Sequence, residues 1–455
     1  MSVEHATARA PRRAISLSAD VRALTLAALA LIGTGAAHAD PLADLPIDLH
    51  AQYTGTVQAH PAFPSAFSGG NSLNRRADAA MTNDITLYIG LSPWKGAELW
   101  VNPEIDQGFG LSDTLGVAGF PSGEAYKVGK QAPYYKTPRA FLRQTINLGG
   151  ATEQVEADAN QHKLSRTADK LVITLGKFGV TDIFDANSYA HDPRRDFMNW
   201  AVIDTGSFDY AANSWGFTIG GAVELYHGAW TARAALMALS NVPNGESIDT
   251  SFAQRQWIGE IERRFTLGHR PGVVRLTGFD TYGRMGRYGD ALALAAASGA
   301  TPDTASVRRY AHRDGLSINA EQVVSDSVGV FARVGIADGS KEAYDFTDID
   351  RTVEAGVSVT GKNWHRKDDV FGAVLLVNDI SKAAQAYFTS GGLGVLVGDG
   401  ALRHKAQEVI AELTYTATLK PWAHLSLDGQ MVFNPAYNSD RGPAPVIALR
   451  LHLAR

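Results

Sequence analysis

Apolar and polar residues alternate along this chain, and this period of two constrains its fold more than any other feature. Between residues 47 and 58, odd-numbered positions hold Ile, Leu, Ala, Tyr, Gly and Val, whereas even-numbered positions hold Asp, His, Gln and Thr. Residues 447–453 alternate in the same way, with isoleucine or leucine at every second position. A period of two places the two kinds of side chain on opposite faces of a strand, and no helix would separate them. The pattern therefore predicts long β-strands.

The same alternation recurs between these two ends, in residues 85–91, 171–175, 328–336, 353–359 and 425–433. The intervening positions often carry charged or polar residues, namely Asp84, Arg333, Glu354, Ser426, Asp428 and Gln430. Strands of about nine to eleven residues fit a tilted transmembrane β-strand. Few segments favour a helix: residues 290–298 are the clearest, and residues 405–412 are ambiguous. The sequence predicts an all-β fold.

Two architectures can carry this pattern. In a soluble sandwich the apolar face points inward, whereas in a membrane barrel it meets lipid and the polar face lines a lumen. Periodicity alone does not distinguish them. The barrel is favoured because the pattern persists along the chain and because the terminal segment is a strand that could close a barrel. Tryptophans near strand ends also suit an interfacial girdle, namely Trp94, Trp100, Trp200, Trp230 and Trp422.

Composition excludes several other classes. The chain has no cysteine, which excludes a disulfide-stapled domain, a thiol enzyme and a cysteine-ligated zinc site. No apolar stretch reaches the roughly 18 residues of a transmembrane helix. The formal net charge is -5, so we expect no nucleic-acid partner.

The first 39 residues have the layout of a secretory signal peptide. Arg9, Arg12, Arg13 and Arg22 precede a short apolar core at residues 23–32, and Ala37-His38-Ala39 places small residues at the cleavage site. We expect residues 1–39 to be cleaved on export and residues 40–455 to form a single outer-membrane barrel domain.

Six blocks rich in glycine and in charged residues follow one another along the chain, at residues 102–124, 137–150, 176–210, 361–369, 391–400 and 434–445. In this order they resemble the carbohydrate-selective porins of Gram-negative outer membranes, the family typified by the glucose-inducible porin of pseudomonads. The resemblance covers residues from about 80 to 453. One departure is the end of the chain, Leu453-Ala454-Arg455, where such barrels usually carry an aromatic residue.

The resemblance implies a transmembrane antiparallel β-barrel of sixteen strands, with long loops partly folded into the lumen. It implies facilitated diffusion of mono- and small oligosaccharides such as glucose across the cell outer membrane. The implied partners are small carbohydrates, outer-membrane lipid and the barrel-assembly machinery, and the resemblance is compatible with a monomer or a homo-oligomer.

The chemistry of sugars indicates which residues could line such a channel. Sugar hydroxyls donate and accept hydrogen bonds, so carboxylates, guanidinium groups and amides suit a constriction, with an aromatic ring nearby. Each hydrogen bond contributes only about 0.5–1.5 kcal/mol net, and this weakness allows release. The candidate channel-lining residues are Glu104, Asp106, Arg139, Arg143, Asp182, Asp185, Asn187, Asp192, Arg194, Arg195, Asn199 and Trp200. Structural roles in loop salt bridges remain the alternative for each of them.

Acidic residues of this chain could also serve other functions. Glu104 and Asp106 could in principle form a glycosidase pair, and Asp345, Asp348 and Asp350 crudely resemble a calcium loop that lacks its glycine and glutamate. No nucleophile elbow, phosphate loop, zinc-binding or dinucleotide fingerprint is present. We expect no enzyme activity, catalytic residue, metal or cofactor. A secreted soluble all-β protein that binds or cleaves polysaccharide, and a general ion porin, stay open as alternatives.

Overall fold

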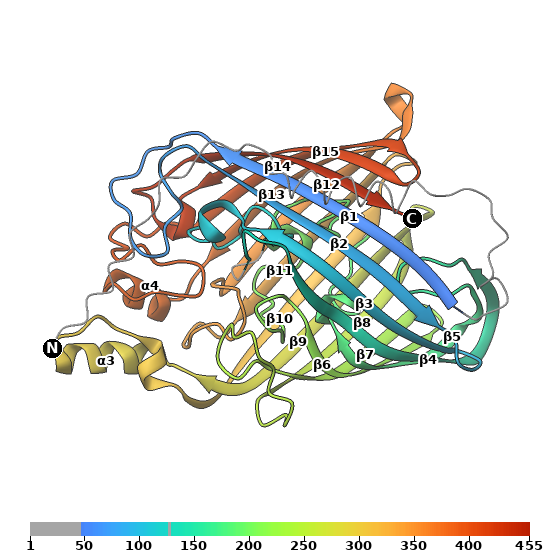
Figure 1. Ribbon diagram of the computed structural model, residues 1–455, viewed down its shortest axis with the longest axis horizontal. Helices are drawn as coiled ribbons and strands as arrows, with labels where there is room; N and C mark the ends of the chain where they lie inside the picture. The colour runs from blue at the N-terminus through green and yellow to red at the C-terminus, as the bar shows by residue number, and fades with distance from the viewer. Residues whose placement is uncertain (1–46, 126–128) are drawn as a thin grey trace.

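The computed structural model describes residues 47–125 and 129–455 and shows one closed antiparallel β-barrel (Figure 1). The strands are β1 (Ile47–His60), β2 (Asp78–Leu91), β3 (Ala97–Gly108), β4 (Tyr134–Val155), β5 (Leu164–Phe178), β6 (Thr218–His227), β7 (Trp230–Ala238), β8 (Arg255–Leu267), β9 (Arg270–Met285), β10 (Arg309–Val323), β11 (Val328–Ala337), β12 (Arg351–Gly361), β13 (Arg366–Asp379), β14 (Glu408–Lys420), β15 (Ala423–Phe433) and β16 (Ala444–Ala454). The sixteen strands confirm the predicted fold class.

Each strand pairs with its neighbours in sequence, and the first and last strands close the ring. β1 and β16 are antiparallel, with Gln52 opposite Ala454 and Ala59 opposite Ile447. This closure is the reason that the alternation continues to the end of the chain. A closed barrel leaves no strand edge unpaired, which the interior of a membrane requires.

The alternating faces point as the barrel interpretation predicts. Leu375, Leu413 and Leu427 lie on the outer surface with 53%, 56% and 58% of their area exposed. Arg333 and Glu354, which stand opposite each other on β11 and β12, are buried on the lumen side. Exposed leucines beside buried charges would be unstable in a water-soluble particle, so the outer face suits a lipid environment.

The connections differ in length at the two ends of the barrel. At one end, called the short-turn end here, the links are residues 92–96, 156–163, 228–229, 268–269, 324–327, 362–365 and 421–422. The other, long-loop end carries the link between β5 and β6, residues 179–217, called the β5–β6 loop below. β1 starts and β16 ends at the short-turn end, opposite α3 and α4 (Figure 1). In outer-membrane barrels the short turns face the periplasm.

Helices are short and lie in the loops: α2 (Trp200–Ile203), α3 (Tyr288–Ser298) and α4 (Lys382–Thr389). The helix predicted at residues 290–298 is confirmed within α3, and the ambiguous segment 405–412 runs into β14. Among the residues that the structure describes, no helix is long and apolar enough to span a membrane. The predicted leader, residues 1–39, lies outside the described residues, so its cleavage stays a prediction.

The tryptophan girdle is confirmed only in part. Trp94, Trp230 and Trp422 are exposed on the outside near strand ends. Trp100 and Trp200 are buried, and for these two the girdle assignment is wrong. Trp100 falls on the lumen-facing side of β3, and Trp200 begins α2 within the β5–β6 loop. The aromatic residue type alone does not reveal which side of the wall a ring occupies.

Candidate functional site: a charged constriction in the lumen

The β5–β6 loop folds into the barrel, where buried arginines of the wall hold its backbone. The Arg333 guanidinium donates to the carbonyl oxygens of Ala190 at 2.6 Å and Val202 at 2.7 Å. Arg450 on β16 donates to the carbonyl oxygen of Asp196 at 3.0 Å. A buried carbonyl group needs a partner, and in a barrel interior the wall must supply it.

Carboxylates of the wall accept from the amides of the same loop. Glu412 on β14 accepts from the Met198 amide at 2.6 Å and from the Asn199 amide at 3.3 Å. Glu321 on β10 accepts from both the amide and the hydroxyl of Ser188. The charged lumen-facing positions of the strands thus fix a long loop across the interior. This loop divides the open space of the lumen.

Two cavities occupy the lumen, and they share one ring of charged residues. The first, about 320 Å³, lies toward the long-loop end, and the second, about 430 Å³, reaches the β4–β5 turn at the short-turn end. The residues that line both cavities are Arg139, Asp182, His191, Asp192 and Arg194. We call this set the constriction, because a solute that moves between the cavities passes these side chains.

Opposite charges face each other at the constriction. Arg139 on β4 makes a bidentate contact with Asp182, with nitrogen–oxygen distances of 2.8 and 2.5 Å. Arg194 contacts Glu124 at 3.2 Å. Burial alone would raise the pKa of Asp182, but the Arg139 charge and the Gly179 amide lower it below its ordinary value. Asp182 is therefore ionised at neutral pH, and its pair with Arg139 adds little net charge to the lumen.

His191 adds a further positive charge to the constriction. Its Nδ1 atom lies 3.6 Å from a carboxylate oxygen of Asp204. Burial would lower the pKa of His191, but the neighbouring Asp204 carboxylate raises it to about 9. Burial would also raise the pKa of Asp192, but the Arg194 charge outweighs it and holds this pKa below the ordinary value of an aspartate. At neutral pH both His191 and Asp192 are charged.

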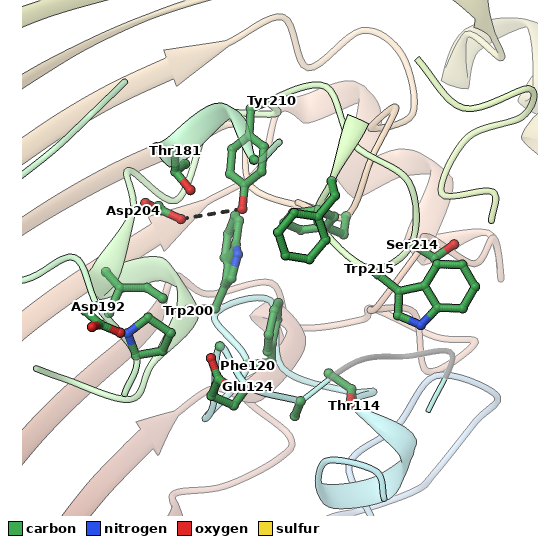
Figure 2. Close-up of a pocket in the computed structure, with 18 of the residues that line it drawn as sticks. Thr114, Phe120, Glu124, Thr181, Asp192, Trp200, Asp204, Tyr210, Ser214 and Trp215 are labelled. Carbon is green, nitrogen blue, oxygen red and sulfur yellow. Dashed lines mark hydrogen bonds between the residues drawn. The ribbon is translucent and has the colours of Figure 1, made fainter. Parts of the chain in front are cut away.

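An aromatic wall lines the cavity on the long-loop side. The Phe120 and Trp200 rings are stacked with centroids 5.4 Å apart, and Phe346 meets Trp200 edge-on at 5.3 Å. Figure 2 shows Trp200 between Phe120 and Tyr210, with the Tyr210 hydroxyl directed toward Asp204. Ring faces beside hydroxyl and carboxylate groups can contact a ligand that is apolar on one side and rich in hydroxyls on its edge.

The match to a protein family covers most of the chain. Residues 71–454 match the model of the OprB family, described as carbohydrate-selective porin. The chain belongs to this carbohydrate-selective porin family. A search of curated proteins found no match.

Solved porins share the barrel at low sequence identity. The high-pH structure of Pseudomonas putida OprB is 15% identical, with a TM-score of 0.68, over 91% of this chain and 95% of that one. The low-pH structure of the same protein is 13% identical, with a TM-score of 0.49, over 91% and 94%. The channel DcaP of Acinetobacter baumannii is 8% identical, with a TM-score of 0.47, over 90% and 97%. The first of these likenesses supports the fold of this carbohydrate-selective porin.

Seven of the twelve residues predicted to line the porin channel border a cavity. They are Arg139, Arg143, Asp182, Asp192, Arg194, Arg195 and Trp200. The other five are Glu104, Asp106, Asp185, Asn187 and Asn199, which are buried and line neither cavity. The first two contact Lys136 at 3.2 and 3.1 Å, respectively. The last three bond loop to wall. These five residues therefore lie where the alternative interpretation puts them, in salt bridges and in bonds that hold the loop to the wall.

Several residues of the porin lumen were not predicted. His191 and Glu124 belong to blocks that the sequence singled out, but a lone histidine and one more carboxylate carried no distinguishing signal. Phe120, Tyr210 and Phe346 come from three different loops, so their convergence is visible only in three dimensions. Among the described residues, no group of three His, Asp or Glu side chains is placed to hold a metal ion. The absence of a cofactor stays a prediction.

Proposed function

We propose that this carbohydrate-selective porin is a passive outer-membrane channel for uncharged mono- and small oligosaccharides. The constriction of paired charges between two cavities carries the proposal. Sugar hydroxyls can exchange hydrogen bonds with water for bonds to these carboxylates and guanidinium groups. The net gain per bond is small, about 0.5–1.5 kcal/mol, so a sugar binds briefly and leaves.

The balance of charge favours sugars over ions. Asp182 neutralises much of Arg139, and Glu124 neutralises much of Arg194. A general ion porin gains selectivity from a ring of one sign, which this constriction does not present. The aromatic wall at Phe120 and Trp200 adds a surface for the less polar face of a sugar ring. Water-filled ion pores have no need of such a surface.

The outer surface and the sequence support an outer-membrane setting for the channel. The exposed leucine- and valine-rich face supports contact with outer-membrane lipid, and the predicted signal peptide supports export. Insertion would then use the barrel-assembly machinery, with the protein acting as a monomer or a homo-oligomer. Transport needs no catalytic residue and no cofactor, because flux follows the concentration gradient.

Liposome swelling tests the function directly. The purified protein is reconstituted, and swelling rates are compared for sugars and for amino acids of equal size, with protein-free liposomes as the control. We expect sugars to enter faster than size-matched amino acids. Rates that depend on molecular size alone would identify a general porin. If the protein stays soluble in buffer without detergent, the proposal of a membrane channel is wrong.

A further inference from the structure

The hairpin of β4 and β5 extends beyond the rest of the barrel at the short-turn end. β4 has 22 residues, and its pairing with β5 shifts register on both sides of Gly149. Gly149 and Gly150 have φ values of 136° and 84°, which residues with a side chain rarely adopt. Register shifts of this kind bend a strand. The hairpin therefore has a built-in bend where it leaves the wall.

The tip of the hairpin, residues 156–163, is bonded to the inside of the barrel. The His162 amide donates to Glu98 at 2.8 Å, and the Arg143 guanidinium donates to the Asn160 carbonyl oxygen at 2.8 Å. The His162 ring also lies against Trp100, with centroids 4.7 Å apart. Because His162 and Glu98 are buried, the tip is a fixed part of the lumen wall.

This tip forms one side of the larger cavity. Asp158, Asn160 and Gln161 line it, and Gln52 and Arg195 line it as well. The cavity holds about 430 Å³, within the range of small-molecule sites. Its lining is mostly polar, in contrast to the aromatic wall on the other side of the constriction. Amides, a carboxylate and guanidinium groups together match the donors and acceptors of a neutral hexose.

We propose that this cavity is a second sugar subsite, at the short-turn mouth, and that the β4–β5 hairpin tip is one of its walls. The inference rests on the proposed sugar transport and adds a binding step after the constriction. A sugar that leaves the constriction exchanges its hydrogen bonds with the constriction for hydrogen bonds with the hairpin tip before it reaches water. Two weak subsites in series lower the barrier between them, as multi-site conduction requires.

Single-channel recording tests the subsite from each side of the membrane. The double variant Asn160→Gly with Gln161→Ala removes the two tip amides, and glycine tolerates the positive φ of residue 160. With glucose added at the short-turn side, we expect half-maximal current block to need about fivefold more sugar. This factor corresponds to the loss of one net hydrogen bond. With glucose added at the long-loop side, we expect a change below twofold. Gln154→Ala, on the exposed part of the same hairpin, is the matched control and should behave as the unmodified protein.

Two outcomes separate the subsite from the function on which it rests. Unchanged block in a variant that still shows sugar-selective liposome swelling overturns the subsite alone. Loss of sugar selectivity in the unmodified protein overturns the proposed function. Heat-modified gel migration verifies that each barrel has folded. If the double variant does not fold, Gln161→Ala alone supplies the comparison, with about half the effect on a logarithmic scale and the same sidedness.

Discussion

The anchoring of the β5–β6 loop by Arg333 gives the sharpest test of how the lumen is built. Arg333 on β11 is fully buried and bonds the carbonyl oxygens of Ala190 and Val202 and the carboxylate of Glu354 at 2.6 to 2.7 Å. Arg333→Met keeps much of the side-chain volume but removes all of these bonds. It also leaves two buried carboxylates without their cation, namely Glu354 and Asp185, whose Oδ2 atom lies 3.5 Å from Arg333 Nε. Breaking a buried pair in this way costs about 3–5 kcal/mol.

The expected result is a loosened loop inside an intact barrel, because the strand ladder on either side of residue 333 is unchanged. Limited proteolysis should cut within residues 179–217, and single-channel records should show larger and noisier conductance. Arg351→Met is the matched control, since that arginine is exposed on the neighbouring strand and lies 3.9 Å from its partner Asp379.

A double variant separates anchoring from the penalty of an orphaned charge. Arg333→Met with Glu354→Leu removes this ion pair and leaves only Asp185 without the cation, so the barrel should regain part of its stability while the loop stays cleavable. Protease resistance and conductance equal to those of the unmodified protein, in either variant, would refute the idea that Arg333 holds the loop.

Three further predictions address the constriction and the outer wall. Arg139→Ala leaves Asp182 without its counter-charge and should raise single-channel conductance and weaken sugar block about fivefold, with insertion unchanged. Unaltered sugar block would show that Arg139 does not contact the sugar. The pKa of His191 is raised from its ordinary value of 6.5 to about 9, so the protonated imidazole stabilises the folded protein. This contribution to the free energy of unfolding is complete below pH 6.5 and is lost as the pH rises through about 9. Ion selectivity should therefore be constant from about pH 6 to 8 and shift above 9, and His191→Gln should abolish the shift. Leu413→Arg on the lipid face should destabilise the barrel by about 2–4 kcal/mol in urea titrations with lipid vesicles, whereas a loss below 1 kcal/mol would place Leu413 away from the membrane core.

Strand alternation predicted an all-β fold, but by itself it neither separated a barrel from a sandwich nor allowed the strands to be counted. β1 and β16 alternate cleanly because one face meets the outside and the other the lumen along their length. β4 breaks its register at Gly149, and β6 contains Gly220 and Gly221 in place of large side chains. Glycines and bulges remove the contrast between faces, so the number sixteen came from the family resemblance.

The candidate site was predictable at the level of blocks and not of single residues. The sequence singled out residues 176–210 as a block rich in charge but did not decide whether it enters the lumen or caps it, and in the structure it folds inside as part of the β5–β6 loop. Within that block Asp182 lines the constriction, whereas Asp185 is buried against Asn319 of the wall. Both are aspartates close in sequence, and nothing in a linear pattern states which carboxylate will meet the backbone and which will meet the solute.

The physical reason lies in the backbone of a loop that crosses a barrel. Each buried amide and carbonyl group of the loop needs a partner, and the wall side chains are the nearest polar groups. Backbone groups of the loop bind three such wall side chains, namely Glu412, Arg333 and Arg450. The charges that can reach a solute are those whose neighbours leave part of the side chain facing open space, such as Arg139 and Asp182. Alternation predicts that a strand residue faces the lumen, and the course of the loop then decides whether its charge serves the fold or the passage of sugar.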